Sequence, residues 1–266
     1  MRIARFTTGD GAAFGVVEGD VEGTGGDPLT IRRIDGHPFA PFQLVGEPLP
    51  LADVRLLAPV LPSKVVAVGR NYADHAREMG GTVDPSTEPP VVFLKPSTSV
   101  IGPDEAVQYP VGVSEEVSYE GELAVVIARL CREVPAERVH DVVLGFTCAN
   151  DVTARDLQRT EQQWGRAKGF DTFCPLGPWV STDLDPSDLA LTTTVNGDLK
   201  QSGRTAQMVR SVDELVSHIS MAMTLLPGDV ILTGTPAGVG PLAVGDEVSV
   251  SIEQVGTLTN RVVARG

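Results

Sequence analysis

The sequence contains few cysteines and no long apolar run. Its 266 residues include only three cysteines, an odd number at widely spaced positions, with no CxxC or Cys/His cluster that would indicate zinc. Reduced thiols and a cytoplasmic location are therefore expected. No stretch of about 18 apolar residues occurs, so no transmembrane helix is expected. The N-terminal residues have a hairpin-like pattern and lack the apolar segment of a signal peptide.

Basic residues are also in deficit. The chain has 21 Lys and Arg against 35 Asp and Glu, which gives a formal net charge of −14. This balance argues against a nucleic-acid partner and against binding to an anionic membrane surface. The segment "GTPAGVG" lacks the Gly-Lys-Ser/Thr ending of a phosphate loop, and "GTGGDP" is too weak to indicate a dinucleotide site.

Long alternation of strands and helices is absent as well, which argues against a doubly wound sheet. The 28 Gly and 20 Pro favour turn-rich β structure. Asn196-Gly197 predicts a hairpin turn, whereas Ser211 and Glu214 form a capping-box pair at the start of the best predicted helix. The sequence therefore predicts a mostly β, α+β architecture. A small β-rich N-terminal domain is expected over residues 1–57, and a larger domain over 58–266.

One predicted strand carries an electrostatic problem. The segment "SYEGELAVVI", residues 118–127, alternates and is apolar on both faces, yet Glu120 and Glu122 point to the same face. Two ionised carboxylates about 7 Å apart would strain each other unless a proton or a cation neutralises them. Asp151 ends the apolar strand "VVLGFTCAND" and offers a third carboxylate. Three such groups suit Mg²⁺, Mn²⁺ or Ca²⁺. The alternative is a solvated edge strand.

A second group of residues suggests acid–base chemistry. In "GRNYADHAREM", a helical turn over residues 73–79 would bring His75 and Glu78 together, and an imidazole held by a carboxylate can activate water. The Gly- and Pro-rich residues that follow, up to about 90, are typical of a mobile lid. For any single histidine a surface or core role is the more common alternative. The other three histidines lack a well-placed acidic partner: His37, His140 and His218.

A third group is basic and polar. Arg155 and Gln158 lie three residues apart in "TARDLQ", Lys168 lies in "GRAKGFDTFCP", and Thr235 lies in "TGTPAGVG". Near a metal these side chains could bind an anionic substrate. Spacing alone instead favours ordinary surface salt bridges for them.

An ordered set of motifs links these groups. In chain order they are "GRNYADHAREM", "FLKPSTS", "YEGELAVVI", "NDVTARDLQ", "AKGFDTFCPLGPW", "VNGDLKQSG" and "LLPGDVILTGTPAGVG". Together they resemble the fumarylacetoacetate hydrolase family over about residues 60–260. Residues 1–55 resemble, more loosely, the small extra domain of many bacterial members. The resemblance implies a mixed β-sandwich roll and a homodimer.

The resemblance also implies roles for the residues named above. Glu120, Glu122 and Asp151 would bind a divalent metal, Mg²⁺ or Mn²⁺, with Ca²⁺ a possible occupant in a crystal. His75 and Glu78 would form a water-activating dyad in the lid. Lys168 would be catalytic, and three further residues would bind the substrate: Arg155, Gln158 and Thr235. Every one of these positions carries the residue type of the family.

The expected function is hydrolysis of a C–C bond in a 2,4-dioxo acid of the acylpyruvate or fumarylpyruvate type, as in aromatic catabolism. The His75–Glu78 dyad would deprotonate water, hydroxide would attack the distal carbonyl, and a metal-stabilised pyruvate enolate would leave. Lys168 would stabilise the oxyanion. Alternatives within the family are a 2-hydroxyhepta-2,4-diene-1,7-dioate isomerase and a decarboxylase of 5-oxopent-3-ene-1,2,5-tricarboxylate or oxaloacetate. A catalytically inactive metal-binding protein and a structural or interaction protein are alternatives of another class.

Overall fold

Short strands dominate the computed structural model, which describes residues 1–20, 26–84 and 88–266. Part of the lid expected up to about residue 90 therefore lies outside the described residues. Within the described chain, thirteen strands form the largest sheet, whose main path runs β4-β3-β2-β1-β15-β13-β12-β18-β7-β8. Those strands are β1 (Arg2–Thr7), β2 (Ala12–Glu18), β3 (Thr30–Asp35), β4 (Gln43–Leu44), β5 (Leu49–Pro50), β6 (Arg55–Leu57), β7 (Val65–Gly69), β8 (Val91–Lys95), β9 (Val100–Ile101), β12 (Gly121–Ile127), β13 (Val143–Asn150), β15 (Cys174–Ser181) and β18 (Val230–Leu232).

Two smaller sheets complete the β structure. The five-stranded sheet has the order β10-β21-β20-β16-β17, and the three-stranded sheet has the order β14-β11-β19. Their bounds are β10 (Val107–Tyr109), β11 (Val117–Tyr119), β14 (Thr153–Ala154), β16 (Ala190–Val195), β17 (Asp198–Arg204), β19 (Gly240–Pro241), β20 (Glu247–Ile252) and β21 (Gly256–Ala264). The predicted mostly β, α+β class is confirmed.

Helices are few and short. The α-helices are α1 (Ala73–Glu78), α2 (Arg155–Thr160), α3 (Gly165–Lys168) and α4 (Val212–Ala222). The 3₁₀ turns are η1 (Leu51–Asp53), η2 (Ser97–Ser99), η3 (Ala136–Asp141), η4 (Pro186–Asp188) and η5 (Thr205–Gln207). The segment "TARDLQRTEQQWGRAKGF" forms two short helices, α2 and α3, and Lys168 lies in α3.

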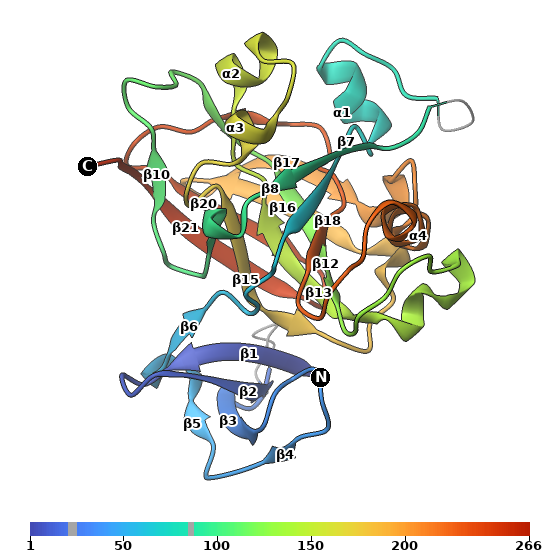
Figure 1. Cartoon of the computed structure of the whole chain (residues 1–266). Helices are drawn as coiled ribbons and strands as arrows, with labels where there is room; N and C mark the ends of the chain where they lie inside the picture. The colour runs from blue at the N-terminus through green and yellow to red at the C-terminus, as the bar shows by residue number, and fades with distance from the viewer. Residues whose placement is uncertain (21–25, 85–87) are drawn as a thin grey trace.

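The N-terminal strands β1 to β6 form a separate lobe in Figure 1. They remain hydrogen-bonded to the rest of the chain, because β1 runs antiparallel to β15 and pairs Arg2 with Ser181 and Ile3 with Val180. The boundary between residues 57 and 58 remains a prediction. It coincides with the end of β6 at Leu57.

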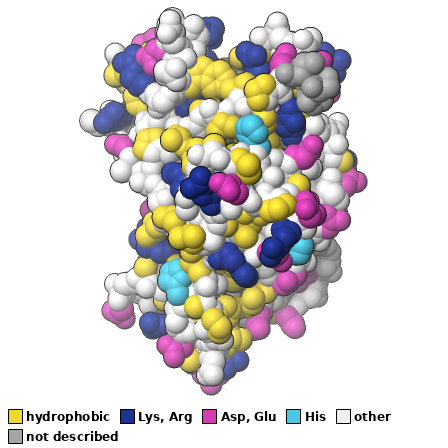
Figure 2. All heavy atoms as spheres, turned by 45° about the vertical axis from the view of Figure 1, so that its right-hand side comes forward, with side chains coloured by type: hydrophobic (Ala, Val, Ile, Leu, Met, Phe, Trp, Pro, Cys, Tyr) yellow, Lys and Arg dark blue, Asp and Glu magenta, His cyan; other side chains and the backbone are white. Residues whose placement is uncertain are grey.

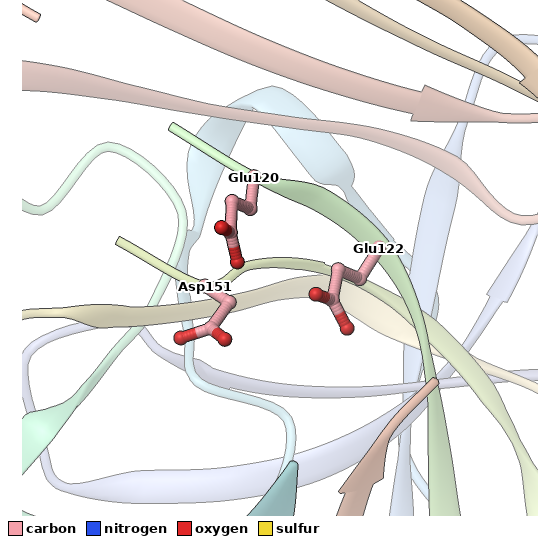
Figure 3. A group of neighbouring side chains, drawn as sticks. All are labelled: Glu120, Glu122 and Asp151. Atoms are coloured by element: carbon pink, nitrogen blue, oxygen red, sulfur yellow. The ribbon is translucent and has the colours of Figure 1, made fainter. Parts of the chain in front are cut away.

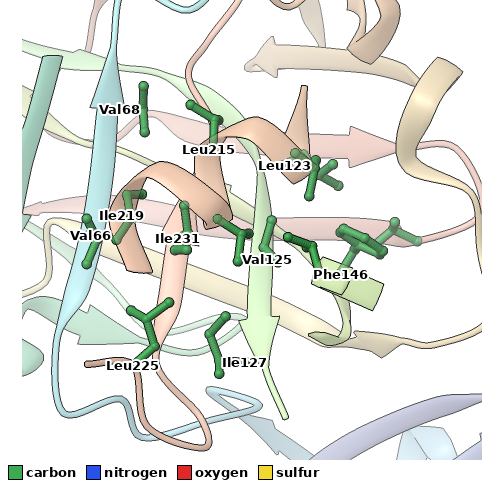
Figure 4. Close-up of a cluster of buried hydrophobic side chains, with 14 of the residues drawn as sticks. Val66, Val68, Leu123, Val125, Ile127, Phe146, Leu215, Ile219, Leu225 and Ile231 are labelled. Atoms are coloured by element: carbon green, nitrogen blue, oxygen red, sulfur yellow. The ribbon is translucent and has the colours of Figure 1, made fainter. Parts of the chain in front are cut away.

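The main hydrophobic core lies between α4, the large sheet and the five-stranded sheet (Figure 4). Leu215 and Ile219 of α4 contribute to it beside Val125 and Ile127 of β12. Burying each such side chain stabilises the fold by about 1.5–3 kcal/mol. The predicted capping box of α4 is present, with Ser211 Oγ accepting a hydrogen bond from the Glu214 N–H.

Local turn chemistry also follows the sequence. Asn196 and Gly197 connect β16 to β17 with φ angles of 53° and 84°, both positive, as a type I′ hairpin turn requires.

All three cysteines are free and buried. No helix of the described chain is long and apolar enough to cross a membrane. On the face shown in Figure 2, basic side chains are scattered among acidic ones.

The segment "SYEGELAVVI" does not form one continuous strand, and in this respect the sequence prediction was wrong. β11 ends at Tyr119 in the three-stranded sheet, and β12 begins at Gly121 in the large sheet, so Glu120 lies where the chain changes sheets. Gly121 fits this place because a Cβ there would lie 2.1 Å from Thr193 Oγ1 of the adjoining sheet. The alternation continues along β12, with Leu123 and Ala124 in two different core clusters.

An ion pair joins Lys64 and Asp229, the residues that directly precede the parallel strands β7 and β18. The Asp229 carboxylate is fully buried and accepts hydrogen bonds from Ser63 Oγ at 2.7 Å, the Leu226 N–H at 2.8 Å and the Lys64 ammonium group. Burial raises the pKa of Asp229, but the bonds from Lys64 and Ser63 outweigh that effect and hold the pKa below its ordinary value.

We expect Asp229→Asn to lower the free energy of unfolding by about 3 kcal/mol at pH 7, because it leaves Lys64 without its charged partner. The folded-state pKa is depressed, so this contribution exists above the unfolded pKa of about 4 and is lost as the pH falls further. Urea unfolding at pH 7 and pH 3 should show the gap between the two proteins narrowing at the lower pH. An equal gap at both would contradict this account.

Candidate metal centre and active site

Three carboxylates meet in one cluster (Figure 3). Glu120 lies at the change of sheets, Glu122 lies in β12, and Asp151 directly follows β13. Because β12 and β13 are antiparallel neighbours that pair Gly121 with Asn150, these side chains converge. All three are buried, and their candidate ligand atoms lie within 4.8 Å of one another. The sequence prediction that they share one site therefore agrees with the geometry.

Buried cations surround the cluster. Lys168 Nζ lies 2.6 Å from Glu120 Oε2 and 2.7 Å from Asp151 Oδ2. Lys95 Nζ lies 2.5 Å from Asp151 Oδ1, and Arg155 Nη2 donates to Glu120 Oε1. Sequence reasoning missed Lys95. The available signal was a lysine at the end of the apolar strand "VVFLK", within the motif "FLKPSTS".

The buried lysine and arginine side chains are unevenly distributed among the three carboxylates. Burial raises the pKa of Glu120, but Arg155 and Lys168 outweigh it and hold the pKa well below its ordinary value. Glu122 has no cationic hydrogen-bond partner among the described residues, so burial and the charges of Asp151 and Glu120 raise its pKa well above its ordinary value. Burial lowers the pKa of Lys168, yet Asp151 and Glu120 raise it overall, so the ammonium form is favoured.

The donor set tests whether a divalent metal fits. The cluster offers only hard oxygen ligands, and Glu122 supplies a carboxylate that the protein's own cations do not compensate. A buried like-charge group of this kind requires a proton or a cation. The residues therefore fit a hard divalent ion, and oxygen donors alone do not choose between Mg²⁺ and Mn²⁺.

The predicted histidine–carboxylate pair lies on α1, at the edge of this cluster. His75 is buried, and its Nδ1 lies 3.1 Å from Glu78 Oε2. Glu78 also accepts a hydrogen bond of 3.1 Å from the Gly238 N–H, which connects α1 to the loop after β18. With Nδ1 facing a carboxylate, the proton of neutral His75 is held on Nδ1 and Nε2 remains available as a base.

A cavity of about 180 Å³ joins these groups. Every predicted site residue except Glu78 lines it. Arg155 Nη1 donates to Gln158 Oε1 at 2.8 Å, so the predicted contact between these two residues is present. Thr235 Oγ1 donates to the Gly121 carbonyl at 2.8 Å and accepts from Gln201 Nε2 at 2.7 Å.

Aromatic and basic residues also line the cavity, and no local pattern in the sequence indicates them. Phe93 and Trp164 pack edge to face with ring centroids 5.4 Å apart. Lys168 Nζ lies 5.0 Å from the centroid of the Phe93 ring, within range of a cation–π interaction. Arg70 also lines the cavity, at a positive φ of 59°. It forms no hydrogen bond or ion pair with the described residues.

A mostly β fold that buries three carboxylates beneath a histidine-bearing helix defines a candidate metal-dependent enzyme. The family model "Fumarylacetoacetate (FAA) hydrolase C-terminal" matches residues 64–263, and "Rv2993c-like, N-terminal" matches residues 1–59. The chain belongs to the fumarylacetoacetate hydrolase family, whose members are hydrolases, isomerases and tautomerases. The resemblance inferred from the motifs is thereby confirmed.

Two relatives illustrate the range of similarity. Protein Rv2993c of Mycobacterium tuberculosis (strain ATCC 25618 / H37Rv) is 55% identical over 100% of this chain and 99% of its own length. Oxaloacetate tautomerase YisK of Bacillus subtilis (strain 168) is 42% identical over 80% of this chain and 74% of its own length.

Solved structures share the fold over the whole chain. 5-Carboxymethyl-2-hydroxymuconate delta-isomerase from Mycobacterium smegmatis is 53% identical, with a TM-score of 0.91 and coverage of 100% of both chains. Maleylpyruvate hydrolase from Sphingobium sp. SYK-6, in complex with manganese (II) ion and pyruvate, is 33% identical, with a TM-score of 0.79 and the same full coverage. The protein is therefore an enzyme of this family, and these neighbours differ in the reaction that they are named for.

The metal assignment predicts a selective effect of removing one carboxylate. We expect Glu122→Gln to weaken Mn²⁺ binding at least 100-fold, because it would remove one of the three candidate anionic ligands of this cluster. Loss of an outer-shell partner alone typically costs about 10–100-fold. Isothermal titration calorimetry with Mn²⁺ measures this directly. Glu116→Gln is the matched control, since Glu116 is an exposed neighbour that pairs with Arg159. Unchanged Mn²⁺ affinity in Glu122→Gln would show that the ligand assignment is wrong.

Proposed function

We propose that the protein is a divalent-metal-dependent enzyme that interconverts the keto and enol forms of a short 2-oxo dicarboxylic acid, with oxaloacetate as the leading substrate. The observation that carries the proposal is that His75 and the three carboxylates face one cavity of about 180 Å³. Sites for drug-sized ligands are larger, about 300–1,000 Å³. The volume therefore favours a short acid, and the similarity to oxaloacetate tautomerases supports the same choice.

The chain's own residues account for the proton transfers. Glu78 holds Nδ1 of His75, and Nε2 removes a proton from carbon 3 of the substrate. The electron pair of that C–H bond forms the C2–C3 double bond, and the 2-oxo oxygen takes a proton from the Lys168 ammonium group. The proton on His75 then returns to Lys168 through solvent, which restores both groups. Lys168 is available for this role because it lines the cavity and because its raised pKa keeps it in the ammonium form.

The acidic cluster supplies the remaining element of the proposal. Glu120, Glu122 and Asp151 would hold Mg²⁺ or Mn²⁺. When bound there, a divalent ion supplies Lewis-acid polarisation of a carbonyl group. Arg155 orients Glu120 and, through Gln158, presents a polar edge to the substrate. The Thr235 hydroxyl lies on the same wall and offers a further acceptor.

Hydrolysis of a 2,4-dioxo acid is the second candidate, because the same pair can deprotonate water. In this reaction His75 activates water, hydroxide attacks the distal carbonyl, and Lys168 stabilises the oxyanion before the C–C bond breaks. The similarity to maleylpyruvate hydrolase, whose structure holds manganese (II) ion and pyruvate, favours retaining it. Isomerisation of a dienedioate and decarboxylation use the same groups. A homodimer, a cytoplasmic location and a place in aromatic catabolism remain predictions from the sequence.

The central test is turnover with and without His75. We expect the Mn²⁺-loaded protein to accelerate oxaloacetate ketonisation beyond Mn²⁺ alone, and His75→Ala to lose about 10²–10⁴-fold, the usual contribution of a general base. Stopped-flow ultraviolet absorbance of the enol measures the rate. His218→Ala is the control, because His218 is exposed on α4.

The outcomes separate the candidates. Pyruvate release from an acylpyruvate, without acceleration of oxaloacetate ketonisation, would select hydrolysis over tautomerisation. Full activity in His75→Ala would refute the role of the dyad. No metal-dependent turnover of any 2-oxo acid, dienedioate or dioxo acid would refute the proposed activity.

Arg70 provides a test of the dicarboxylate preference. It is exposed at the cavity and has no partner among the described residues, so it can receive a second carboxylate of the substrate. We expect Arg70→Met to raise KM for oxaloacetate about tenfold, the scale of one charge-assisted hydrogen bond, with little change in kcat. KM for acetylpyruvate, which lacks the distal carboxylate, should change little. Arg77→Met, at an exposed arginine paired with Asp74, is the control. Equal effects on both substrates would contradict this role.

A further inference from the structure

Each carboxylate of the cluster has one oxygen that accepts a hydrogen bond from a partner of its own. Asp151 Oδ1 accepts from Lys95, Glu120 Oε1 accepts from Arg155, and Glu122 Oε2 accepts a bond of 2.6 Å from the Gly234 N–H. The second oxygens differ from these. Those of Glu120 and Asp151 both contact Lys168, and Oε1 of Glu122 has no hydrogen bond from the described residues.

Lys95 is the least expected of these partners. Its side chain is 0% exposed, and its ammonium group contacts Asp151 Oδ1 at 2.5 Å and the Val152 carbonyl at 3.2 Å. The backbone of β8 holds it in register against β7, where Lys95 pairs with Val65. Unlike Lys168, Lys95 does not line the cavity, so it contacts no substrate there.

We infer that Lys95 is a positioning residue that engages one oxygen of Asp151 and leaves Asp151 a single oxygen with which to bind a metal ion. Arg155 and Gly234 do the same for Glu120 and Glu122, so one oxygen of each carboxylate is left for a divalent ion, and two of these three oxygens also contact Lys168. An octahedral ion then keeps three of its six positions for water or for the oxygens of a 2-oxo acid. This inference rests on the proposed metal site and not on the reaction.

The inference predicts that removing the Lys95 charge strengthens metal binding but weakens the binding of a chelating ligand to the metal. A neutral side chain takes away a positive charge near the cation, which strengthens metal binding. It also frees Oδ1, so that Asp151 can bind with both oxygens, which Asp and Glu ligands also do. One fewer position then remains for a chelating ligand, whose binding weakens. A merely structural role for Lys95 would weaken metal binding and chelator binding together.

The experiment compares wild type, Lys95→Met and Lys64→Met. Lys64→Met is the matched control, because it breaks another lysine–aspartate pair, with buried Asp229, outside the site. Three quantities are measured without turnover: Mn²⁺ affinity from the electron paramagnetic resonance signal of free Mn²⁺, the number of waters on bound Mn²⁺ from water-proton relaxation, and oxalate affinity of the Mn²⁺-loaded protein by calorimetry.

We expect about three waters on Mn²⁺ in wild type and about two in Lys95→Met, from octahedral coordination. Lys95→Met should bind Mn²⁺ about tenfold more tightly, because one nearby positive charge is lost. It should bind oxalate at least tenfold more weakly, because one position on the metal is no longer available. Lys64→Met should match wild type in all three quantities.

A wild-type water number and wild-type oxalate affinity in Lys95→Met would overturn the inference. Weaker binding of both Mn²⁺ and oxalate would also overturn it. If Lys95→Met does not fold, the number of waters on Mn²⁺ bound to the wild-type protein tests the inference. Three waters support three carboxylates that each bind through one oxygen. Two or fewer waters contradict this arrangement. Failure of wild type to bind Mn²⁺ would instead refute the proposed metal site itself.

Discussion

The burial of three carboxylates in one small volume is the constraint on which the surrounding structure depends. Water cannot compensate these groups, so other side chains must do so. Lys95 arrives on β8, Arg155 on α2 and Lys168 on α3, and each reaches the cluster from a different part of the chain. The short helices α2 and α3 contribute little to the main hydrophobic core. Their structural role is to place Arg155 and Lys168 against the buried carboxylates.

Helix α1 and the neighbouring strands complete this arrangement. Glu78 links His75 to the Gly238 N–H, so α1 is held by a loop that begins at the end of β18. β18 pairs with both β7, which leads towards α1, and β12, which carries Glu122. The base and the acidic cluster therefore share one set of neighbouring strands. This common support explains how His75 can be placed over the carboxylates by so short a helix.

The parts of the site that the sequence predicted are those with local signals. Alternation placed Glu120 and Glu122 on one face, a strand end placed Asp151, and helical spacing paired His75 with Glu78. Lys95 had only a weak local signal, a lysine at the end of an apolar strand, and its partner could not be inferred because the contact with Asp151 spans 56 residues of sequence. The break at Glu120 was missed for a similar reason, since it depends on packing against Thr193 in another sheet. The roles of Arg155, Gln158 and Thr235 came from the resemblance rather than from spacing.

Gly121 has a consequence for engineering this kind of site. The residue between the two glutamates faces Thr193, and a Cβ there would lie 2.1 Å from Thr193 Oγ1. The glycine in Glu-Gly-Glu is therefore set by the separation of two sheets and not by the metal chemistry. Transplanting the two glutamates into another strand would copy the ligands without the support that brings them together. A designed scaffold would have to reproduce the close sheet-to-sheet contact first, and only then the carboxylates.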